Sequence, residues 1–223
     1  MRTAKRSPAA AGRGALVASM LVGTALVASC GIPLDNKPRA IAPSKALPAE
    51  SNSVSPDGVT QAWMYAVQDD RLVAKQADVS STDPTSVLTA LISGPGVSDE
   101  ANSIINQIPP GTTLLGFDTN GSAATLNLSQ EFGNLVGIGG TQATAQIVLT
   151  ATELEGIEAV SFQVQGRPVL VVSPTSGDSE TVGACDYVGL LATAEELQAT
   201  TLDRETVRHL NQRRNVLNRT CES

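Results

Sequence analysis

The sequence has few aromatic residues and only one histidine. Three Phe, two Tyr and one Trp stand among 223 residues. That is too few for the aromatic platforms on which sugars or nucleic-acid bases stack. The histidine, His209, lies beside Arg208 in a polar stretch, so we expect a solvated side chain rather than a general base. No Gly-x-Ser-x-Gly motif occurs, which argues against the simplest serine hydrolase.

The chain opens with a basic segment and a short apolar run. Arg2, Lys5, Arg6 and Arg13 are accompanied by no acidic residue, and the uncharged run 15–29 is rich in Ala, Leu and Val. A membrane-spanning helix needs about twenty apolar residues, so this run is too short to span a bilayer. A positive start followed by a short apolar run is typical of an export signal.

The apolar run ends in small residues directly before a cysteine. The sequence Leu-Val-Ala-Ser-Cys-Gly that ends at Gly31 resembles the lipobox of bacterial lipoproteins. The resemblance implies a signal peptide over residues 1–29, cleavage before Cys30 and a diacylglycerol on its thiol. Acyl chains there would hold the protein on the extracytoplasmic face of the cell membrane. An ordinary secretory signal with an incidental cysteine, or an uncleaved anchor, is the alternative.

The rest of the chain is poor in basic residues. Four of the fifteen Lys and Arg lie before residue 30 and none of the twenty-two Asp and Glu does, which leaves eleven basic against twenty-two acidic residues. Phosphates would be repelled by this excess of negative charge, so we expect no nucleic-acid partner. Broad adhesion to anionic lipid headgroups is disfavoured for the same reason. We therefore expect the acyl anchor to provide the membrane attachment.

Residues 30–58 are expected to be the lipidated cysteine and a tether. Five prolines recur about every five residues, at Pro33, Pro38, Pro43, Pro48 and Pro56. Proline lacks a backbone donor and has a fixed φ, so such a segment favours extended, semi-rigid chain over regular structure.

Residues 59–172 alternate between strand and helix patterns. The expected order is strands Thr60–Val67 and Arg71–Gln76, a helix opened by Asp83-Pro84 that runs through Ile92, a loop over Val97–Gly111, strands Thr112–Phe117 and Ser122–Leu128, a helix over Thr141–Leu154, strand Val160–Val164 and edge strand Pro168–Val172. Asn120-Gly121 predicts a hairpin turn with two positive φ angles. This order predicts an α+β domain with a mixed or antiparallel sheet and two helices packed on one face.

Five segments of this region resemble the GerMN domain family. They are Leu88–Pro95, Ile108–Leu114, Ala124–Phe132, Ala145–Thr150 and Gly156–Phe162, in that order. Members are exported and often lipid-anchored, and include spore-envelope proteins of the GerM type and actinobacterial lipoproteins such as LpqB. The resemblance implies a non-catalytic module that contacts other envelope proteins, and it supplies no catalytic residues.

The last part, residues 173–223, is expected to be a loop and a C-terminal helical extension. Pro174–Val182 is rich in Ser, Thr and Gly and predicts a loop, and Asp203 can cap a helix that runs to Asn218. Arginines gather in this helix, at Arg204, Arg208, Arg213, Arg214 and Arg219. Four of them, Arg204, Arg208, Arg213 and Arg214, are expected to form a basic face that could meet anionic lipid or an acidic partner. A solvated face is the alternative, and the one that we favour.

Two cysteines remain after Cys30. An even pair in an exported chain suggests a disulfide between Cys185 and Cys221, and two unrelated free thiols are the alternative.

Three further motifs have structural explanations. Gly137-Ile138-Gly139-Gly140 could cradle a phosphate before a helix, but it lacks a P-loop lysine, so we favour a flexible helix entry. The segment 118–121 resembles the opening of a calcium loop but has no later bidentate Glu. The carboxylates of Asp69-Asp70 and Asp99-Glu100 are expected to be solvated. We expect no metal and no cofactor.

Together these observations predict a membrane-anchored extracytoplasmic lipoprotein that is not an enzyme. Its domain would be an interaction or assembly module that meets an unidentified envelope or membrane protein. The alternatives are an envelope hydrolase, or a carrier of a small ligand or lipid.

Overall fold

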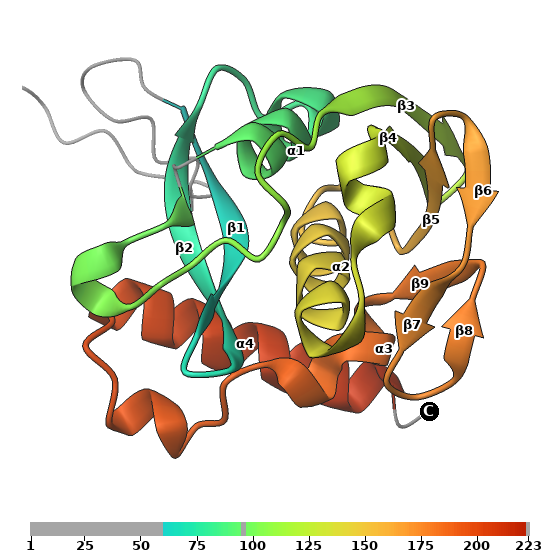
Figure 1. The fold of residues 1–223 in the computed structure, drawn as a ribbon. Helices are drawn as coiled ribbons and strands as arrows, with labels where there is room; N and C mark the ends of the chain where they lie inside the picture. The colour runs from blue at the N-terminus through green and yellow to red at the C-terminus, as the bar shows by residue number, and fades with distance from the viewer. Residues whose placement is uncertain (1–59, 95–96, 222–223) are drawn as a thin grey trace, which may run out of the picture. The chain divides into compact units, whose positions relative to one another are not determined.

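The computed structural model describes residues 60–94 and 97–221, so Cys30, the expected signal peptide and the expected tether lie outside the described residues. The strands are β1 (Thr60–Gln68), β2 (Arg71–Val79), β3 (Leu114–Asn120), β4 (Ala123–Leu128), β5 (Ala159–Val164), β6 (Arg167–Val169), β7 (Val171–Ser173), β8 (Gly177–Ser179) and β9 (Thr181–Gly183), and the α-helices are α1 (Pro84–Ser93), α2 (Gly137–Ala151), α3 (Ala184–Tyr187) and α4 (Arg204–Cys221) (Figure 1). This content confirms the α+β class.

The described strands form three sheets instead of one. The largest has the order β3-β4-β5-β6, with β9 also paired to β5. Strands β4 and β5 run parallel, with α2 between them in the chain, while the other pairs in this sheet are antiparallel. The sheet is therefore mixed, as expected. The β1–β2 hairpin and the β7–β8 hairpin are separate two-stranded sheets.

The β3–β4 hairpin forms as predicted, but its turn differs from the predicted one. Asn120 pairs with Ala123 at the end of the ladder, so the loop is Gly121-Ser122 and only Gly121, at φ 62°, has positive φ. Two positive φ angles occur instead at Gln165-Gly166, between β5 and β6. Cross-strand register moved the turn by one residue, which a dipeptide signal cannot report.

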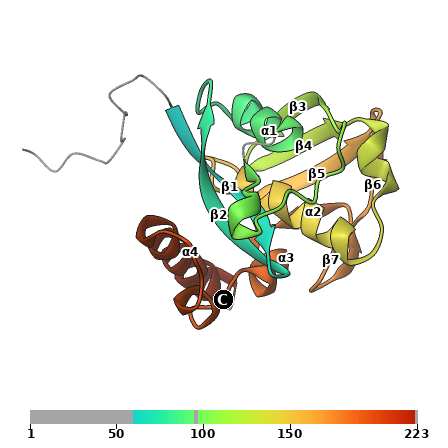
Figure 2. The same cartoon turned by 60° about the vertical axis from the view of Figure 1, so that its left-hand side comes forward.

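Helix α2 is the central element of the fold. Eleven of its fifteen residues are buried, and it lies between the β1–β2 hairpin and the five-stranded sheet, with α1 beside it (Figures 1 and 2). A helix that is covered on most sides needs no solvent-facing polar side, and this accounts for the Ala, Ile, Val and Leu that fill most positions after Thr144. The helix begins at Gly137, so the glycines expected to form a flexible entry are its first turn.

A polar stripe on α2 binds the free backbone of β1. Gln142, Gln146 and Thr150 recur every four residues on α2 and are at most 3% exposed. Thr150 Oγ1 accepts from Tyr65 N at 3.0 Å, and Gln146 Nε2 donates to Tyr65 O at 3.0 Å. These side chains take the place of a neighbouring strand, because a buried backbone group without a partner costs about 1–3 kcal/mol.

The chain after residue 172 continues the same structure. Pro174–Val182, expected to be a loop, contains β8 and the start of β9, and β9 pairs with β5 inside the main sheet. Described residues on both sides of position 172 belong to one compact unit, and Tyr187, Leu210 and Leu217 join its core. Helix α4 begins as expected, because the Asp203 carboxylate accepts from the backbone N–H of Thr206 at 2.9 Å.

Candidate functional site

A partly buried carboxylate joins the domain to the C-terminal helix. Glu153 follows the end of α2, and its side chain is 16% exposed. Tyr65 Oη of β1 donates to Glu153 Oε1 at 2.6 Å. His209 Nε2 and Arg213 Nε of α4 lie 3.3 and 3.2 Å from the same oxygen, at ion-pair distance but without hydrogen-bond geometry. We call these four residues the Glu153 cluster.

His209 is not the solvated side chain that the sequence predicted. Its ring stacks on Trp63 of β1, with centroids 4.0 Å apart and planes 6° apart, and the side chain is 19% exposed. Stacking covers the face of the indole that the β1–β2 hairpin leaves open. No local pattern signals this contact, because Trp63, Glu153 and His209 are far apart in the sequence.

The cluster shifts the pKa values of its acidic members. Burial would raise the pKa of the Glu153 carboxyl, but contacts with His209 and Arg213 and the hydrogen bond from Tyr65 outweigh it and lower that pKa. Burial, together with the Glu153 charge, raises the pKa of Tyr65 well above its ordinary value. Glu153 is therefore ionised and Tyr65 neutral at neutral pH, which suits a fixed contact better than proton transfer.

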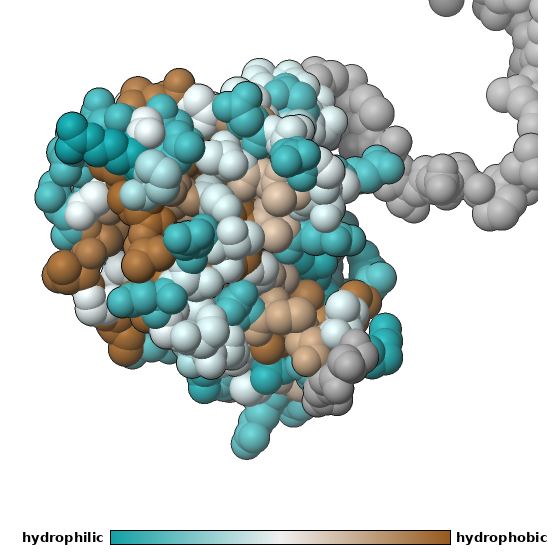
Figure 3. All heavy atoms as spheres, turned by 90° about the vertical axis from the view of Figure 1, so that its right-hand side faces the viewer, coloured by the Kyte–Doolittle hydropathy of each residue, from teal (hydrophilic) through white to brown (hydrophobic). Residues whose placement is uncertain are grey.

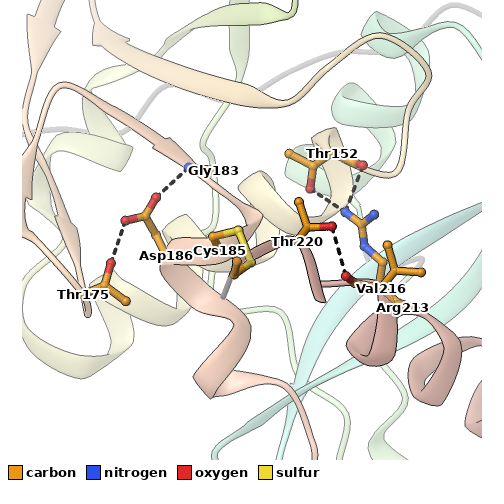
Figure 4. Close-up of a disulfide and its surroundings, with 9 residues drawn as sticks. Thr152, Thr175, Gly183, Cys185, Asp186, Arg213, Val216 and Thr220 are labelled. Atoms are coloured by element: carbon orange, nitrogen blue, oxygen red, sulfur yellow. Dashed lines mark hydrogen bonds between the residues drawn. A yellow bond between two sulfur atoms is a disulfide. The ribbon is translucent and has the colours of Figure 1, made fainter. Parts of the chain in front are cut away.

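The four arginines expected to form a surface divide into two kinds. Arg213 Nη2 donates to the backbone oxygen and to the hydroxyl of Thr152, each at 2.9 Å (Figure 4). Arg214 Nη1 donates to the backbone oxygen of Leu191 at 2.7 Å. Arg204 and Arg208 are exposed. Half of the basic set therefore fastens α4 to the domain, and the other half faces solvent.

The expected cysteine pair lies at the far end of α4. Cys185 and Cys221 are joined by a disulfide, which ties the start of α3 to the end of α4 (Figure 4). The neighbouring Asp186 accepts from the backbone N–H of Gly183 at 2.8 Å and from the Thr175 hydroxyl at 2.9 Å. Burial would raise the pKa of Asp186, but these hydrogen bonds lower it.

A cleft of about 420 Å³ lies between the tip of the β1–β2 hairpin and the segment before α4. Polar residues that line the cleft are hydrogen-bonded to each other. Gln68 Nε2 donates to Asn102 O at 2.7 Å, and Thr201 Oγ1 donates to Asn102 Oδ1 at 2.8 Å. Arg71 forms an ion pair with Glu196 at 2.9 Å. The groups best suited to hold a polar ligand are thus engaged within the protein.

The other motifs have structural roles among the described residues. Asp69 and Asp70 occupy the β1–β2 turn at φ 48° and 64°. Asp99 is not simply solvated, because it binds Lys75 at 3.4 Å. Within residues 60–94 and 97–221, no group of His, Cys, Asp and Glu is arranged to hold a metal ion. In the same part of the chain, no helix has both the length and the hydropathy needed to cross a membrane.

Comparison with known proteins decides the family. The model of the Germane family, described as "Sporulation and spore germination", matches residues 53–170. The chain belongs to the Germane family. No match was found among the curated proteins.

Solved structures of GerMN domains resemble the Germane domain of this chain. The tandem GerMN domains of the sporulation protein GerM from Bacillus subtilis match at 20% identity and a TM-score of 0.48, covering 57% of this chain and 47% of that one. This chain thus spans less than half the length of that protein. The first GerMN domain of GerM alone matches at 19% and 0.45, covering 56% and 97%. A Clostridium perfringens protein described as a candidate lipoprotein matches at 22% and 0.40, covering 65% and 99%.

The Glu153 cluster contains residues from inside and from outside the segment that the family model matches. Tyr65 and Glu153 lie inside residues 53–170, whereas His209 and Arg213 lie beyond them. In this protein the Germane domain therefore carries an extension that is fixed to it by charge and stacking, while the disulfide joins two parts of the extension itself.

Proposed function

We propose that the protein is a membrane-anchored extracytoplasmic lipoprotein, and that its Germane domain is a non-catalytic interaction or assembly module of the cell envelope. The observation that carries the proposal is the order of features before residue 31: basic residues, a short apolar run, small residues and Cys30. Acyl chains on one cysteine give stable membrane attachment without a spanning helix.

The use of the charged groups in the domain supports a role in binding. Glu153 faces two basic side chains of α4, and Asp186 is hydrogen-bonded within its own loop. Both carboxyl groups have a lowered pKa, which makes them poor proton donors near neutral pH. These groups serve the architecture, and the exposed surface is left for partner contact.

Lipid labelling tests the anchor. Cells that express the full chain are fed radiolabelled palmitate, and the membrane and soluble fractions are compared for wild type, Cys30→Ser and the control Cys185→Ser. We expect label and membrane retention for wild type and Cys185→Ser, and loss of both for Cys30→Ser. Retention of unlabelled Cys30→Ser in the membrane would refute the anchor.

Activity assays test the interaction role separately. The exported chain from Gly31 to Ser223 is incubated with peptidoglycan and with ester substrates. We expect no hydrolysis above that of the Glu153→Gln and Asp186→Asn variants. If wild type hydrolyses either substrate and a point variant abolishes that hydrolysis, the protein is an envelope hydrolase and the proposed non-catalytic role is refuted.

A further inference from the structure

Exposed large apolar side chains gather at one place on the described surface. Seven are substantially exposed, and four of them surround the start of α2 and the link from β6 to β7: Val136 at 84%, Ile138 at 77%, Leu170 at 59% and Val172 at 50%. We call these four residues the apolar patch. Single exposed apolar residues are ordinary, but a contiguous group on a soluble domain marks an interaction site.

The apolar patch surrounds a hollow of about 140 Å³. Val136, Leu170 and Val172 line it, and Phe132 and Val164 are among the buried side chains beneath them. Figure 3 shows hydrophobic residues gathered on part of the face that carries β6 and β7. An apolar rim around a hollow that is lined mainly by apolar side chains can receive a side chain of a partner, as happens at the centre of protein interfaces.

The apolar patch faces away from the start of the described chain. The start of β1 lies at one side of the domain, and β6 lies at the opposite side in both views (Figures 1 and 2).

Charge around the apolar patch selects the kind of partner. Exposed acidic residues stand next to the lining: Glu131 directly precedes Phe132, and Asp178 of β8 pairs with Val172 of β7, with the exposed Glu180 two residues further on. Across residues 131–180 the only basic residue is Arg167. More widely, residues 76–203 contain fifteen Asp and Glu and no other basic residue. A second copy would bring the same acidic rim, and an anionic bilayer would bring phosphates, so both are disfavoured by repulsion.

We propose that the apolar patch is the docking surface for a segment of another envelope protein whose apolar side chains are flanked by Lys or Arg. Apolar side chains of that segment fill the hollow, and its basic residues meet the acidic rim. The inference deepens the proposed function, on which it rests, by naming the surface and the chemistry of its partner.

Site-specific photocrosslinking in native membranes tests the proposal with the full chain. A photoreactive residue replaces Ile138 in the apolar patch or, as a matched control, Leu115, which is 50% exposed on β3 away from the hollow. We expect an adduct at position 138 and not at position 115. The crosslinked segment, identified by mass spectrometry, is expected to be apolar with flanking Lys or Arg.

The affinity of the contact is then measured with a synthetic peptide that has the sequence of the captured segment. It is titrated against full-length wild type and against Leu170→Ser and Leu115→Ser, both at exposed positions. We expect Leu170→Ser to weaken binding about tenfold or more and Leu115→Ser less than twofold. Replacing the basic flanks of the peptide by Gln is expected to weaken binding and to reduce its dependence on salt.

Every other outcome overturns the proposal. These are no adduct at position 138, equal adducts at both positions, an adduct with lipid or with a second copy, a captured segment without basic flanks, or a peptide that binds Leu170→Ser as well as wild type. Failure of the anchor is read separately, from the fractionation of Cys30→Ser.

Discussion

The disulfide between Cys185 and Cys221 makes a quantitative prediction for the stability of the domain. The two residues are 36 positions apart, and closing a loop of that length in the unfolded chain reduces its entropy by an amount worth about 4 kcal/mol at 25 °C. For a domain of this size, 1 kcal/mol corresponds to about 2–4 °C in Tm. The Cys185→Ser/Cys221→Ser variant is therefore expected to unfold about 8–16 °C below wild type.

Urea and thermal unfolding of the chain from Gly31 to Ser223 check this prediction. Trp63, the only tryptophan, stacks on His209, so its fluorescence reports the docking of α4, while circular dichroism reports helix content. In reductant, wild type is expected to have the same stability as the double variant. The stability of the double variant is expected not to change when reductant is added. A loss below about 1 kcal/mol would refute the reasoning, because it would mean that the other contacts of α4 already hold the loop closed in the denatured chain.

Three further changes have expected outcomes, each measured by urea unfolding. Glu153→Gln is expected to cost about 3 kcal/mol at pH 7, because it leaves basic side chains of α4 without their carboxylate. The folded pKa of Glu153 is lowered, so its contribution is complete above the ordinary glutamate pKa of about 4.3 and is lost as the pH falls through the folded value; the variant is expected to lose less stability over that acid range. Thr150→Val is expected to cost about 1–3 kcal/mol, because it leaves the buried N–H of Tyr65 without its acceptor. Gly183→Ala is expected to cost about 1–3 kcal/mol, because a Cβ would lie 2.9 Å from the backbone oxygen of Glu158.

Matched controls distinguish these mechanisms. Thr144→Val removes only a bond from the hydroxyl to the Gly140 carbonyl within α2, so it is expected to cost less than Thr150→Val. Gly189→Ala meets no atom within 4 Å and is expected to be tolerated. If the two variants of either pair lost the same amount of stability, the contacts assigned to that pair would be contradicted. An unchanged acid limb in Glu153→Gln would show that other carboxyl groups determine acid sensitivity.

Local signals in the sequence predicted most single elements. Asp83 followed by Pro84 gave the start of α1, and the Asp83 side chain does accept from Ser86 N at 3.0 Å. Asp203 likewise gave the start of α4. Such signals succeed because a cap, its proline and the apolar spacing that follows all act within one or two helical turns.

Features that depend on distant contacts were not predictable in this way. The pairing of β9 with β5 joins Val182 to Val160, and three-residue strands rich in Ser, Thr and Gly carry no period that distinguishes them from a loop. The stacking of His209 on Trp63 depends on where α4 docks. The apolar spacing of α4 predicts that Leu210 and Leu217 face the core, but it does not predict which strand they pack against.

The pairing of β9 beside β5 determines how this protein can be divided. The family match stops at residue 170, but a polypeptide cut there would expose the backbone of 159–161 and uncover the indole of Trp63. Open strand edges and bare aromatic surface recruit other chains, so such a truncation would aggregate. A recombinant piece meant for crystallisation or binding work therefore needs to extend through Cys221, even though the recognisable family sequence ends some fifty residues earlier.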